Sequence, residues 1–455
     1  MRGRGNAAYR WICATVAALA MGAAISPSVD AQEISAEGRA QLEALFEEIL
    51  KNPTDLDLTY KYAQEATRLG DYEAAITAYE RLLLFNPNLP RVKAELGVLY
   101  YRLGSFDTSR AYLEEALASD PPAAARERIE GFLARIDASK RRHSFSGSAS
   151  AGLRYQSNAN YGPDGTILVT DIPAIADDDT EGGEDWNVFT ALSGRYVYDL
   201  GNDAGDFFSV EGTFYGARQF EFTDLDVEHV RVTAGPGFRL YPTDSGPVLF
   251  RPTLRLTYVR LDNESYNYAA GMGADFTWQA FEDTSLFLSS FAEGRDYKAT
   301  EKRPNAGTQD GAAVRVTTGA IHRLTDTLSL KAEGTGARIY ADDASESYAE
   351  FGGGLTLAAE VPSPFAGSET LSVLGAPWSV TASARYLRRT YEGPNLLVST
   401  KTRDEDDVRF DAAAAVPIGQ SWSVFATVGY QDNGANIPNN DFENFSVALG
   451  ASLRF

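Results

Sequence analysis

Residues 445–455 read Phe-Ser-Val-Ala-Leu-Gly-Ala-Ser-Leu-Arg-Phe. Apolar residues alternate along this stretch with serine, alanine, glycine and arginine. Because successive residues of a strand point to opposite faces, the pattern predicts a strand with one apolar and one polar or small face. The closing strand of a membrane-spanning barrel needs such faces, one toward lipid and the other toward the lumen.

The same alternation recurs through residues 143–455 and predicts an all-β transmembrane barrel of about fourteen antiparallel strands. We expect strands at 145–155, 185–199, 206–219, 226–241, 247–261, 266–281, 284–297, 308–323, 327–341, 346–361, 376–391, 404–417, 420–431 and 442–455. An even number of strands puts both ends of the barrel on the same side. We expect that side to be the periplasm, because a soluble block precedes the first strand.

The expected connections alternate between long and short, as in outer-membrane barrels. The segments 156–184, 298–307, 392–403 and 432–441 are long and polar, which is typical of extracellular loops. The intervening connections are short. One exception is 362–375, which is long on the expected periplasmic side.

The closing strand also carries an expected assembly signal. Gly450, Leu453 and Phe455 belong to an ending that resembles the C-terminal signal read by the outer-membrane barrel assembly machinery. A barrel without this strand would expose an unpaired edge in lipid. We therefore expect the assembly machinery and outer-membrane lipid among the partners.

Arginines recur on the faces expected to line the lumen, and they include Arg231, Arg239, Arg251 and Arg255. Charges on the lipid face would be destabilising, so they gather inside. A conduit for a polar substrate and a plain solvated interior with cross-strand ion pairs both fit this pattern.

Composition excludes some classes of function. The 455 residues carry a formal net charge of −22, which disfavours nucleic acid as a partner because phosphate contacts need lysine and arginine. The mean hydropathy is −0.26. After the N-terminus, no run approaches the roughly 20 apolar residues of a spanning helix.

Residues 1–31 read as a secretory signal peptide, with a basic start, an apolar stretch and a cleavage site after Ala31. The only cysteine, Cys13, lies in that segment. We therefore expect a mature chain without thiol chemistry or disulfides.

Residues 32–142 repeat with a period of 34, because Pro53, Pro87 and Pro121 are each 34 apart, as are Gly70 and Gly104. Stretches such as 69–76 resemble tetratricopeptide repeats, which have this period and form an all-α solenoid that binds peptides or proteins. We expect helices at 36–51 and 123–139 around full repeats at 56–89 and 90–123. The residues expected to shape the repeats or to bind the partner are Tyr62, Ala63, Gly70, Tyr72, Ala75, Tyr79, Pro87, Gly97, Gly104 and Pro121.

Catalytic, cofactor and metal sites are not expected. The three histidines are isolated, and neither a nucleophile elbow nor a phosphate-binding loop is present. The acidic run 177–179 could bind calcium, and the basic run 140–143 could bind a partner or lipid headgroups. Both runs have a plainer interpretation as solvated segments. We therefore expect a protein that is not an enzyme and has no cofactor.

The signal peptide, short repeat block and barrel together resemble the surface lipoprotein assembly modulator (Slam) family. The stretch 152–160, Gly-Leu-Arg-Tyr-Gln-Ser-Asn-Ala-Asn, resembles the family's first strand, which ends in an Asn-x-Asn element, and it assigns Tyr155, Asn158 and Asn160 to that motif. The resemblance implies that the repeats bind a client surface protein or lipoprotein in the periplasm and that the barrel exports or displays it.

Two other functions also fit the sequence. One is exopolysaccharide export, whose proteins usually carry a much longer repeat array. The other is a passive solute porin, for which a long inward-folded loop would be expected.

Overall fold

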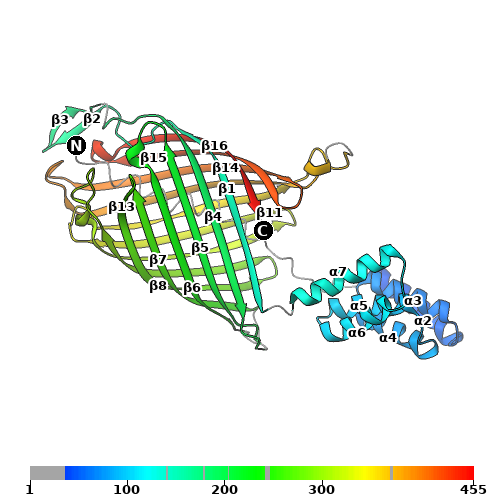
Figure 1. Cartoon of the computed structure of the whole chain (residues 1–455). Coiled ribbons are helices and arrows are strands. Elements are labelled where there is room, and N and C mark those ends of the chain that lie inside the picture. Colours follow the sequence, from blue (N-terminus) through cyan, green and yellow to red (C-terminus); the bar gives the residue numbers. More distant parts are fainter. Residues whose placement is uncertain (1–35, 140–141, 178–179, 203, 241–245, 369–371) are drawn as a thin grey trace. The chain divides into compact units, whose positions relative to one another are not determined.

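The computed structural model describes residues 36–139, 142–177, 180–202, 204–240, 246–368 and 372–455. The chain divides into two compact units, one of helices and one of strands, which meet in the sequence at Arg142 and His143 (Figure 1). The expected signal peptide, residues 1–31, lies outside the described residues, as does part of the basic run 140–143.

The helical unit contains the six expected helices. They are α2 (Ala36–Lys51), α3 (Leu56–Leu69), α4 (Tyr72–Phe85), α5 (Pro90–Arg102), α6 (Phe106–Leu117) and α7 (Ala123–Ser139). Asp55 begins α3 by accepting a 2.9 Å hydrogen bond from the amide of Leu58, and Gly70 ends it with a φ of 85°. Glycine adopts this left-handed conformation without the steric cost of a Cβ.

The interior of the helical unit explains the spacing of its small residues. Ala63, Ala75 and Tyr79 are buried in its core. A Cβ on Gly97 would lie 2.5 Å from the Cγ atom of Leu113, so α5 and α6 pack closely because this position is glycine. The 34-residue period of these small residues therefore reflects the positions at which neighbouring helices pack closely.

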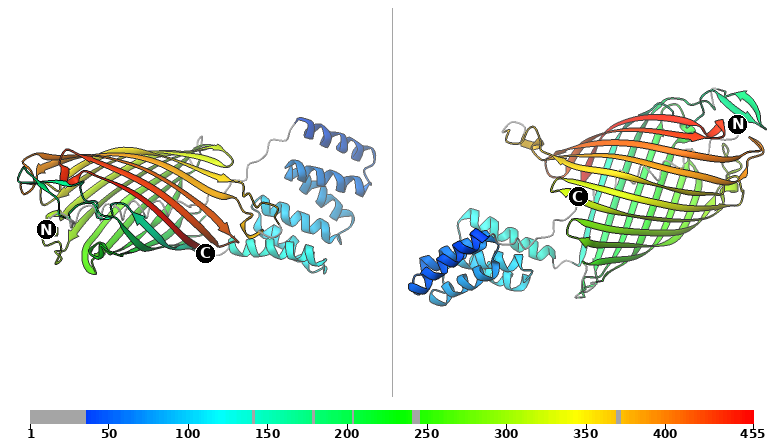
Figure 2. Two further views of the ribbon diagram at one scale, coloured as in Figure 1. Left: turned by 90° about the horizontal axis from the view of Figure 1, so that it is seen from above. Right: turned by 180° about the vertical axis from the view of Figure 1, so that it is seen from behind.

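The second unit is a closed barrel of fourteen antiparallel strands (Figure 2). Its strands are β1 (His143–Gln156), β4 (Asp185–Asp199), β5 (Phe207–Gln219), β6 (Val227–Leu240), β7 (Val248–Leu261), β8 (Glu264–Phe281), β9 (Thr284–Tyr297), β10 (Gly311–Thr325), β11 (Leu328–Ala341), β12 (Tyr348–Val361), β13 (Trp378–Pro394), β14 (Thr402–Ile418), β15 (Trp422–Ala435) and β16 (Phe442–Arg454). The predicted fold class is confirmed, and most strand bounds agree within two or three residues.

The closing strand pairs with the first strand, as expected. Gly450 lies opposite Gly152, and Leu453 lies opposite Ala149. A Cβ on Gly450 would lie 2.4 Å from the carbonyl oxygen of Ala151, so this seam is tightly packed. The start of β1 and the end of β16 therefore lie at the same end of the barrel, which is called here the terminal end. The opposite end is called the loop end.

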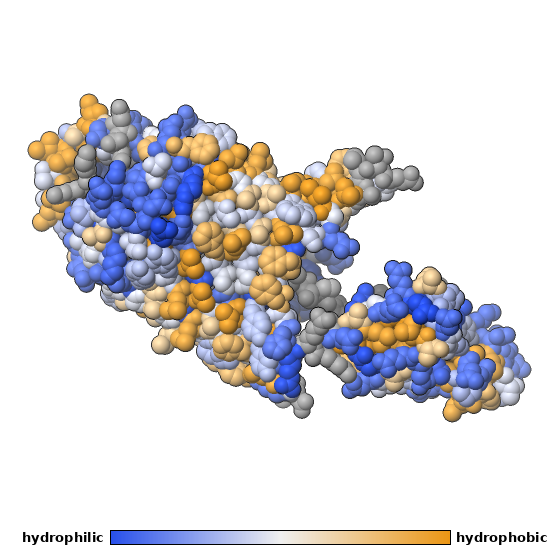
Figure 3. Space-filling view, viewed as in Figure 1, coloured by the Kyte–Doolittle hydropathy of each residue, from blue (hydrophilic) through white to orange (hydrophobic). Residues whose placement is uncertain are grey.

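The outer face of the barrel is apolar. Exposed Leu254, Leu256 and Leu355 belong to a band of large apolar side chains that a water-soluble sheet would bury. Aromatic residues border this band: Tyr155, Trp186, Tyr268, Tyr386 and Tyr430 near the loop end, and Phe145, Tyr196, Phe208, Trp422 and Phe455 near the terminal end. Figure 3 shows hydrophilic residues gathered toward the loop end on the face in view. These features are those of a membrane-spanning barrel.

Among the described residues, no helix is long and apolar enough to cross a membrane. The connections differ from expectation in two places. The first long connection contains a small sheet of β2 (Thr166–Val169) and β3 (Ile172–Ile175) that the sequence analysis missed. The turn at Asp262 and Asn263 is tight although it lies at the loop end, so the predicted alternation has a second exception besides 362–375.

Candidate functional site

The lumen is lined by every second residue of each strand. The register places Arg231 and Arg239 on the inner face of β6, and Arg251 and Arg255 on the inner face of β7. Their sequence neighbours Val230, Val232 and Leu254 are exposed on the apolar outer face. The four expected lumen arginines therefore do face the interior of the barrel.

Burial changes along the lumen. Near the loop end, each strand contributes at least one inward side chain that is buried, for example Asn187 on β4, His229 on β6, Asn267 on β8 and Glu405 on β14. Toward the terminal end, most inward residues are partly exposed. The lumen is thus a vestibule that is accessible from the terminal end and packed at the loop end.

One part of the packed end is a charged cluster centred on Arg389. Its Nε atom lies 2.7 Å from a carboxylate oxygen of Glu350, and its Nη1 atom lies 3.1 Å from Asp407 and 3.4 Å from Glu405. All four side chains are at most 4% exposed. Arg409 donates two further hydrogen bonds to Asp407, of 2.9 and 2.8 Å. Buried charges of this kind persist only when they are paired.

The opposite part of the packed end is aromatic. Tyr266 and Tyr297 lie edge to face at 5.5 Å and join Phe189 in one buried cluster. Ala306, from the connection between β9 and β10, packs into the same cluster. Arg303 of that connection is also buried and reaches the carbonyl of Asp224 at 3.2 Å. Connections therefore fold inward to fill this end of the lumen.

Asn158 and Asn160 hold the base of the first connection. The Asn158 side chain donates to the carbonyl of Gly162 at 2.9 Å and accepts from the Gly162 amide at 3.0 Å. Asn160 makes the equivalent pair of bonds to Glu181 and Gly183. The Asn-x-Asn element thus has a structural role, which is to close a loop.

The tip of the first connection reaches a distant loop. The carboxylate of Asp171 accepts hydrogen bonds from the hydroxyls of Ser399 and Thr400, and from the Thr400 amide at 3.0 Å. These bonds hold the pKa of Asp171 below its usual value. The Leu168 amide donates a hydrogen bond to the Asn439 side-chain oxygen, and the Asn439 side-chain nitrogen donates one to the Leu168 carbonyl. The β2–β3 hairpin is therefore a strap between loops.

Tyr161 connects the strap to the lumen. Its ring is buried 5.3 Å from that of Phe442, and its hydroxyl accepts a 2.9 Å bond from Gln156. Tyr155 lies outside, where its hydroxyl donates to Glu184 at 2.5 Å. The first connection thus closes part of the loop end and belongs to the candidate site.

Several inward-facing arginines lie over aromatic rings. Arg255 lies 3.7 Å from the ring centre of Phe291, and Arg154 lies 4.9 Å from that of Phe189. Arg251 pairs with Glu211 at 2.7 Å. Cation–π contacts position guanidinium groups without cancelling their charge.

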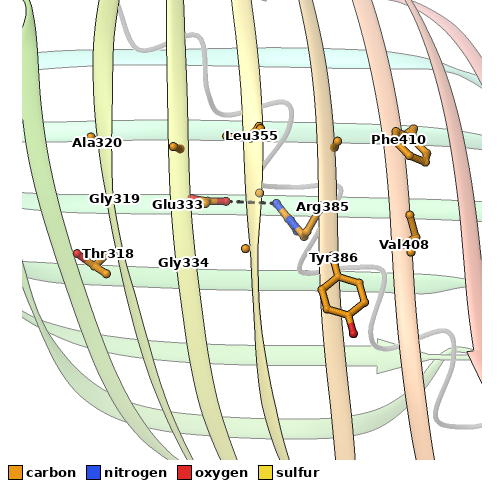
Figure 4. A pocket seen from close by; sticks show the side chains of 14 residues that line it. Thr318, Gly319, Ala320, Glu333, Gly334, Leu355, Arg385, Tyr386, Val408 and Phe410 are labelled. Carbon is orange, nitrogen blue, oxygen red and sulfur yellow. Dashed lines mark ion pairs between the residues drawn. The ribbon is translucent and has the colours of Figure 1, made fainter.

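The outer wall of β10–β14 carries a groove of about 710 Å³. Gly334 and Gly353 leave its floor without side chains, and Tyr386 and Phe410 border it. Figure 4 shows Glu333 and Arg385 directed toward one another, with 3.7 Å between their charged atoms. Both residues line the groove although they occupy lumen-facing positions of their strands.

In the helical unit, Ala63, Ala75, Tyr79 and Gly97 are buried, so they shape the repeats and do not form an accessible surface. Among the more accessible residues, Tyr72, Pro87, Gly104 and Pro121 lie at or next to helix ends, whereas Tyr62 lies in the middle of α3. Tyr72 carries the guanidinium of Arg102 over its ring at 5.2 Å. A hydrogen bond to Glu80 raises the pKa of the Tyr100 hydroxyl to about 12.

Among the described residues, no group of three or more histidine, cysteine or acidic side chains could hold a metal ion. His143 contacts the Tyr196 hydroxyl, His229 is buried in the barrel, and His322 contacts Thr284. The Asp177 carboxylate accepts a bond from Thr180, and the rest of that acidic run lies outside the described residues.

Arg389, Tyr161 and Asp171 were not among the functional residues predicted from the sequence. Arg389 follows the strand alternation and could have been placed in the lumen, but its acidic partners come from other strands. Asp171 follows Thr170 in a short turn, and both residues have positive φ values, of 52° and 64°. A turn of this kind is clearly signalled by Asn-Gly but not by Thr-Asp.

A tetratricopeptide repeat family model matches residues 64–134. No curated protein sequence matches the chain. Among solved structures, an anion-selective porin from Comamonas acidovorans is 9% identical with a TM-score of 0.35, over 69% of this chain and 99% of that chain. A bacterial polysaccharide outer membrane secretin is 9% identical with a TM-score of 0.33, over 68% and 98%.

PcrH in complex with the chaperone binding region of PopD is 19% identical with a TM-score of 0.21, over 31% of this chain and 99% of that chain. TM-scores this low carry no functional argument.

Proposed function

We propose that the chain is an outer-membrane translocation factor that exports or displays a client protein or lipoprotein on the cell surface, as the Slam resemblance implies. The tetratricopeptide repeats bind the client in the periplasm, and the barrel delivers it. The barrel assembly machinery would insert the protein, and neither a cofactor nor catalysis is involved.

The connectivity supports the orientation that this proposal requires. Residues 140–142 join α7 to β1, so the repeats are attached to the strand that begins at the terminal end. An export factor must meet its client before the membrane, which puts the terminal end in the periplasm. Attachment through a short segment raises the local concentration of a bound client at the barrel.

The observation that carries the proposal is the burial gradient of the lumen. A passive porin needs a lumen that is wet from end to end, whereas here side chains such as Arg389 and Tyr266 are packed at the loop end. A vestibule that is accessible from the terminal end and packed at the loop end suits a barrel that receives a cargo and opens on demand.

Export of an anionic polysaccharide is the second candidate. It is favoured by the arginines of β6 and β7, since no acidic residue shares their inner faces. The short repeat array, with two full repeats, favours a protein client.

Deletion of the gene followed by quantitative surface proteomics tests the proposal. We expect loss of one or a few surface proteins, with recovery when the full chain is expressed again. A matched variant lacking 32–139 but keeping the signal peptide and barrel should assemble and fail to restore the client. An unchanged surface proteome would rule out protein export, and loss of surface polysaccharide in its place would favour the second candidate.

A further inference from the structure

The connection between β12 and β13, residues 362–377, is long and apolar although it lies at the terminal end. In the sequence, Glu369 is its only charged residue. The turn between β8 and β9, at the same end, consists of Glu282 and Asp283. Figure 1 shows the connection projecting from the terminal end of the barrel. Its composition therefore differs from that of a solvated turn.

Hydrogen bonds hold the described parts of the connection in a defined shape. The hydroxyl of Ser363, which is buried, donates a 2.6 Å bond to the carbonyl of Leu374 and so ties the two arms together. The amide of Gly419, in the turn after β14, donates a 3.1 Å bond to the carbonyl of Val373. The connection therefore reaches from the end of β12 past the start of β13 to the end of β14.

The aromatic residue of the connection packs on the lipid side of the wall. Trp378 begins β13, and Val380, two residues later, is exposed on the outer face. Residues two apart in a strand share a face, so Trp378 faces outward as well. Its partner across the ladder is Val361, which is also exposed. The ring of Phe365 lies 6.5 Å from that of Trp378, so the connection contacts the outer face.

Apolar surface continues from the outer face onto the connection. Val373 is 57% exposed, and Pro364 and Ala366 are exposed too. Figure 3 shows apolar residues covering the projecting segment beside the atoms drawn in grey. Because this surface is continuous with the band that contacts lipid, the same lipid is the partner that it fits.

The backbone of the connection decides how deep it can lie. Irregular backbone that is exposed to lipid is not tolerated in the hydrocarbon region, because its amide and carbonyl groups would lack partners. At the interface, water and headgroups satisfy these groups while apolar and aromatic side chains face the acyl chains. Pro362, Pro364 and Pro377 also reduce the number of amides that need a partner. The interface is therefore the depth that fits this segment.

We propose that the two described arms, 362–368 and 372–377, form an interfacial anchor that binds the phospholipid surface at the terminal end of the barrel. Phe365 and Val373 enter the boundary between headgroups and acyl chains, and Trp378 completes the anchor from the strand. Such anchors set the tilt of a spanning element, so this one holds β12–β14 at a fixed depth. The inference rests on the membrane-spanning barrel and goes beyond the proposed export function.

A phospholipid surface fits better than a protein partner. Protein interfaces surround an apolar core with a polar rim, and the connection offers Glu369 as its only charge. The outer face on which Phe365 packs is itself covered by lipid in a spanning barrel. A protein would therefore have to displace lipid to reach the connection.

The test uses the full-length chain in vesicles of phosphatidylethanolamine and phosphatidylglycerol. Cys13→Ser removes the native thiol, and a nitroxide is attached at Ala366→Cys. Electron paramagnetic resonance measures collisions with oxygen and with a water-soluble nickel chelate present on both sides of the membrane. Nickel collisions at position 366 should be at least about fivefold rarer than at Asp326→Cys, an exposed site in the turn after β10, because the chelate is excluded from the acyl boundary. Oxygen collisions should be more frequent at position 366 than at position 326.

A double variant separates the anchor from the label. Phe365→Gln with Val373→Gln should raise nickel collisions at position 366 toward the value at position 326. The matched control is Val169→Gln with Leu396→Gln, which changes two exposed apolar residues at the loop end and should leave position 366 as it was. Electrophoretic heat-modifiability reports barrel folding in every variant.

Three results would overturn the anchor. Nickel collisions at position 366 as frequent as at position 326 would place the connection in water. Rare collisions with both reagents would show that protein covers it, such as a second copy of the chain. Unchanged collisions in the folded glutamine pair would show that Phe365 and Val373 do not hold it at the interface. None of these results bears on export, which the surface proteome tests separately.

Discussion

The backbone amide of Gly147 donates a 2.8 Å hydrogen bond to the carbonyl of Phe455, and the Phe455 amide donates a 3.1 Å bond back to Gly147. The last residue of the chain thereby pairs with the first barrel strand, and its ring stacks on Phe145 at 5.7 Å. This pair extends the closing seam to the terminal edge, where an open ladder would leave backbone groups unsatisfied in lipid.

Gly147→Ala should impair closure of the barrel. The new Cβ would lie 2.6 Å from the carbonyl oxygen of Ser193 and 2.8 Å from the Phe455 ring, an overpacking that costs about 1–3 kcal/mol. Heat-modifiability on semi-native gels measures the folded fraction at increasing temperature. Gly212→Ala is the matched control, because a Cβ there meets nothing within 4 Å. Equal thermal stability of the two variants would contradict the tight seam.

Arg389→Met should open and destabilise the loop end. It leaves Glu350, Glu405 and Asp407 without their shared cation, and breaking a buried ion pair typically costs about 3–5 kcal/mol. Planar-bilayer recordings should show larger or more frequent conductance, and thermal unfolding should occur earlier.

The neighbouring Arg388→Met is the control for that variant. Arg388 faces outward, is 42% exposed and pairs with Asp404 at 2.8 Å, so its loss should cost less than about 1 kcal/mol. If Arg388→Met and Arg389→Met gave the same conductance, the buried cluster would not be what closes the lumen.

The strap should release in acid. Bonds from Ser399 and Thr400 lower the pKa of Asp171, so its contribution is complete above the ordinary aspartate pKa of about 3.9 and disappears as the pH falls through the lower folded value. Spin labels at the exposed residues Val169 and Leu396 should show a narrow distance distribution at neutral pH and a broad one near pH 2.

Two substitutions sharpen this measurement. Asp171→Asn should broaden the distribution already at neutral pH and remove most of the acid response. Asp164→Asn, in the same connection, should leave both unchanged. A distribution that stays narrow in Asp171→Asn would show that other contacts hold the strap.

Gly97→Ala should loosen the helical unit. Its Cβ would lie 2.5 Å from Leu113 Cγ in a fully packed site, and Ser109 already bonds the Gly97 carbonyl at 2.6 Å, so we expect a loss of about 1–3 kcal/mol. Gly131→Ala on α7 meets nothing within 4 Å and should stabilise the unit by about 0.5–1 kcal/mol. Protease sensitivity of residues 36–139 in the full chain distinguishes the two.

The fold was predictable because lipid and lumen impose a period of two on each strand. Val230 to Arg239 and Val424 to Tyr430 show this alternation without any tertiary information. The repeat helices were predictable because Gly70 and Gly104 mark helix ends, with φ values of 85° and 74°. The tight turn at Asp262–Asn263 carried a signal too, since both residue types tolerate positive φ.

The side-chain contacts that pack the loop end of the lumen could not be predicted from the sequence. The contact between Glu350 and Arg389 depends on the register between β12 and β13, and a slip by one residue would turn a side chain outward. The Asp171–Thr400 clasp joins residues 229 apart through two irregular loops, for which no period exists. Local patterns therefore predicted which residues face the lumen, and tertiary contacts decided which of them close it.

Site-specific photo-crosslinking in living cells shows whether a client protein passes through the vestibule. A photoreactive residue replaces Thr233 on the lumen face of β6, and Val232, its neighbour on the lipid face, serves as the control position. The export account predicts that position 233 crosslinks a protein that also disappears from the cell surface when the gene is deleted, and that position 232 does not. Two results would contradict passage through the vestibule. One is a crosslink to that protein from position 232 alone, and the other is no crosslink from either position to a protein whose surface display depends on the gene.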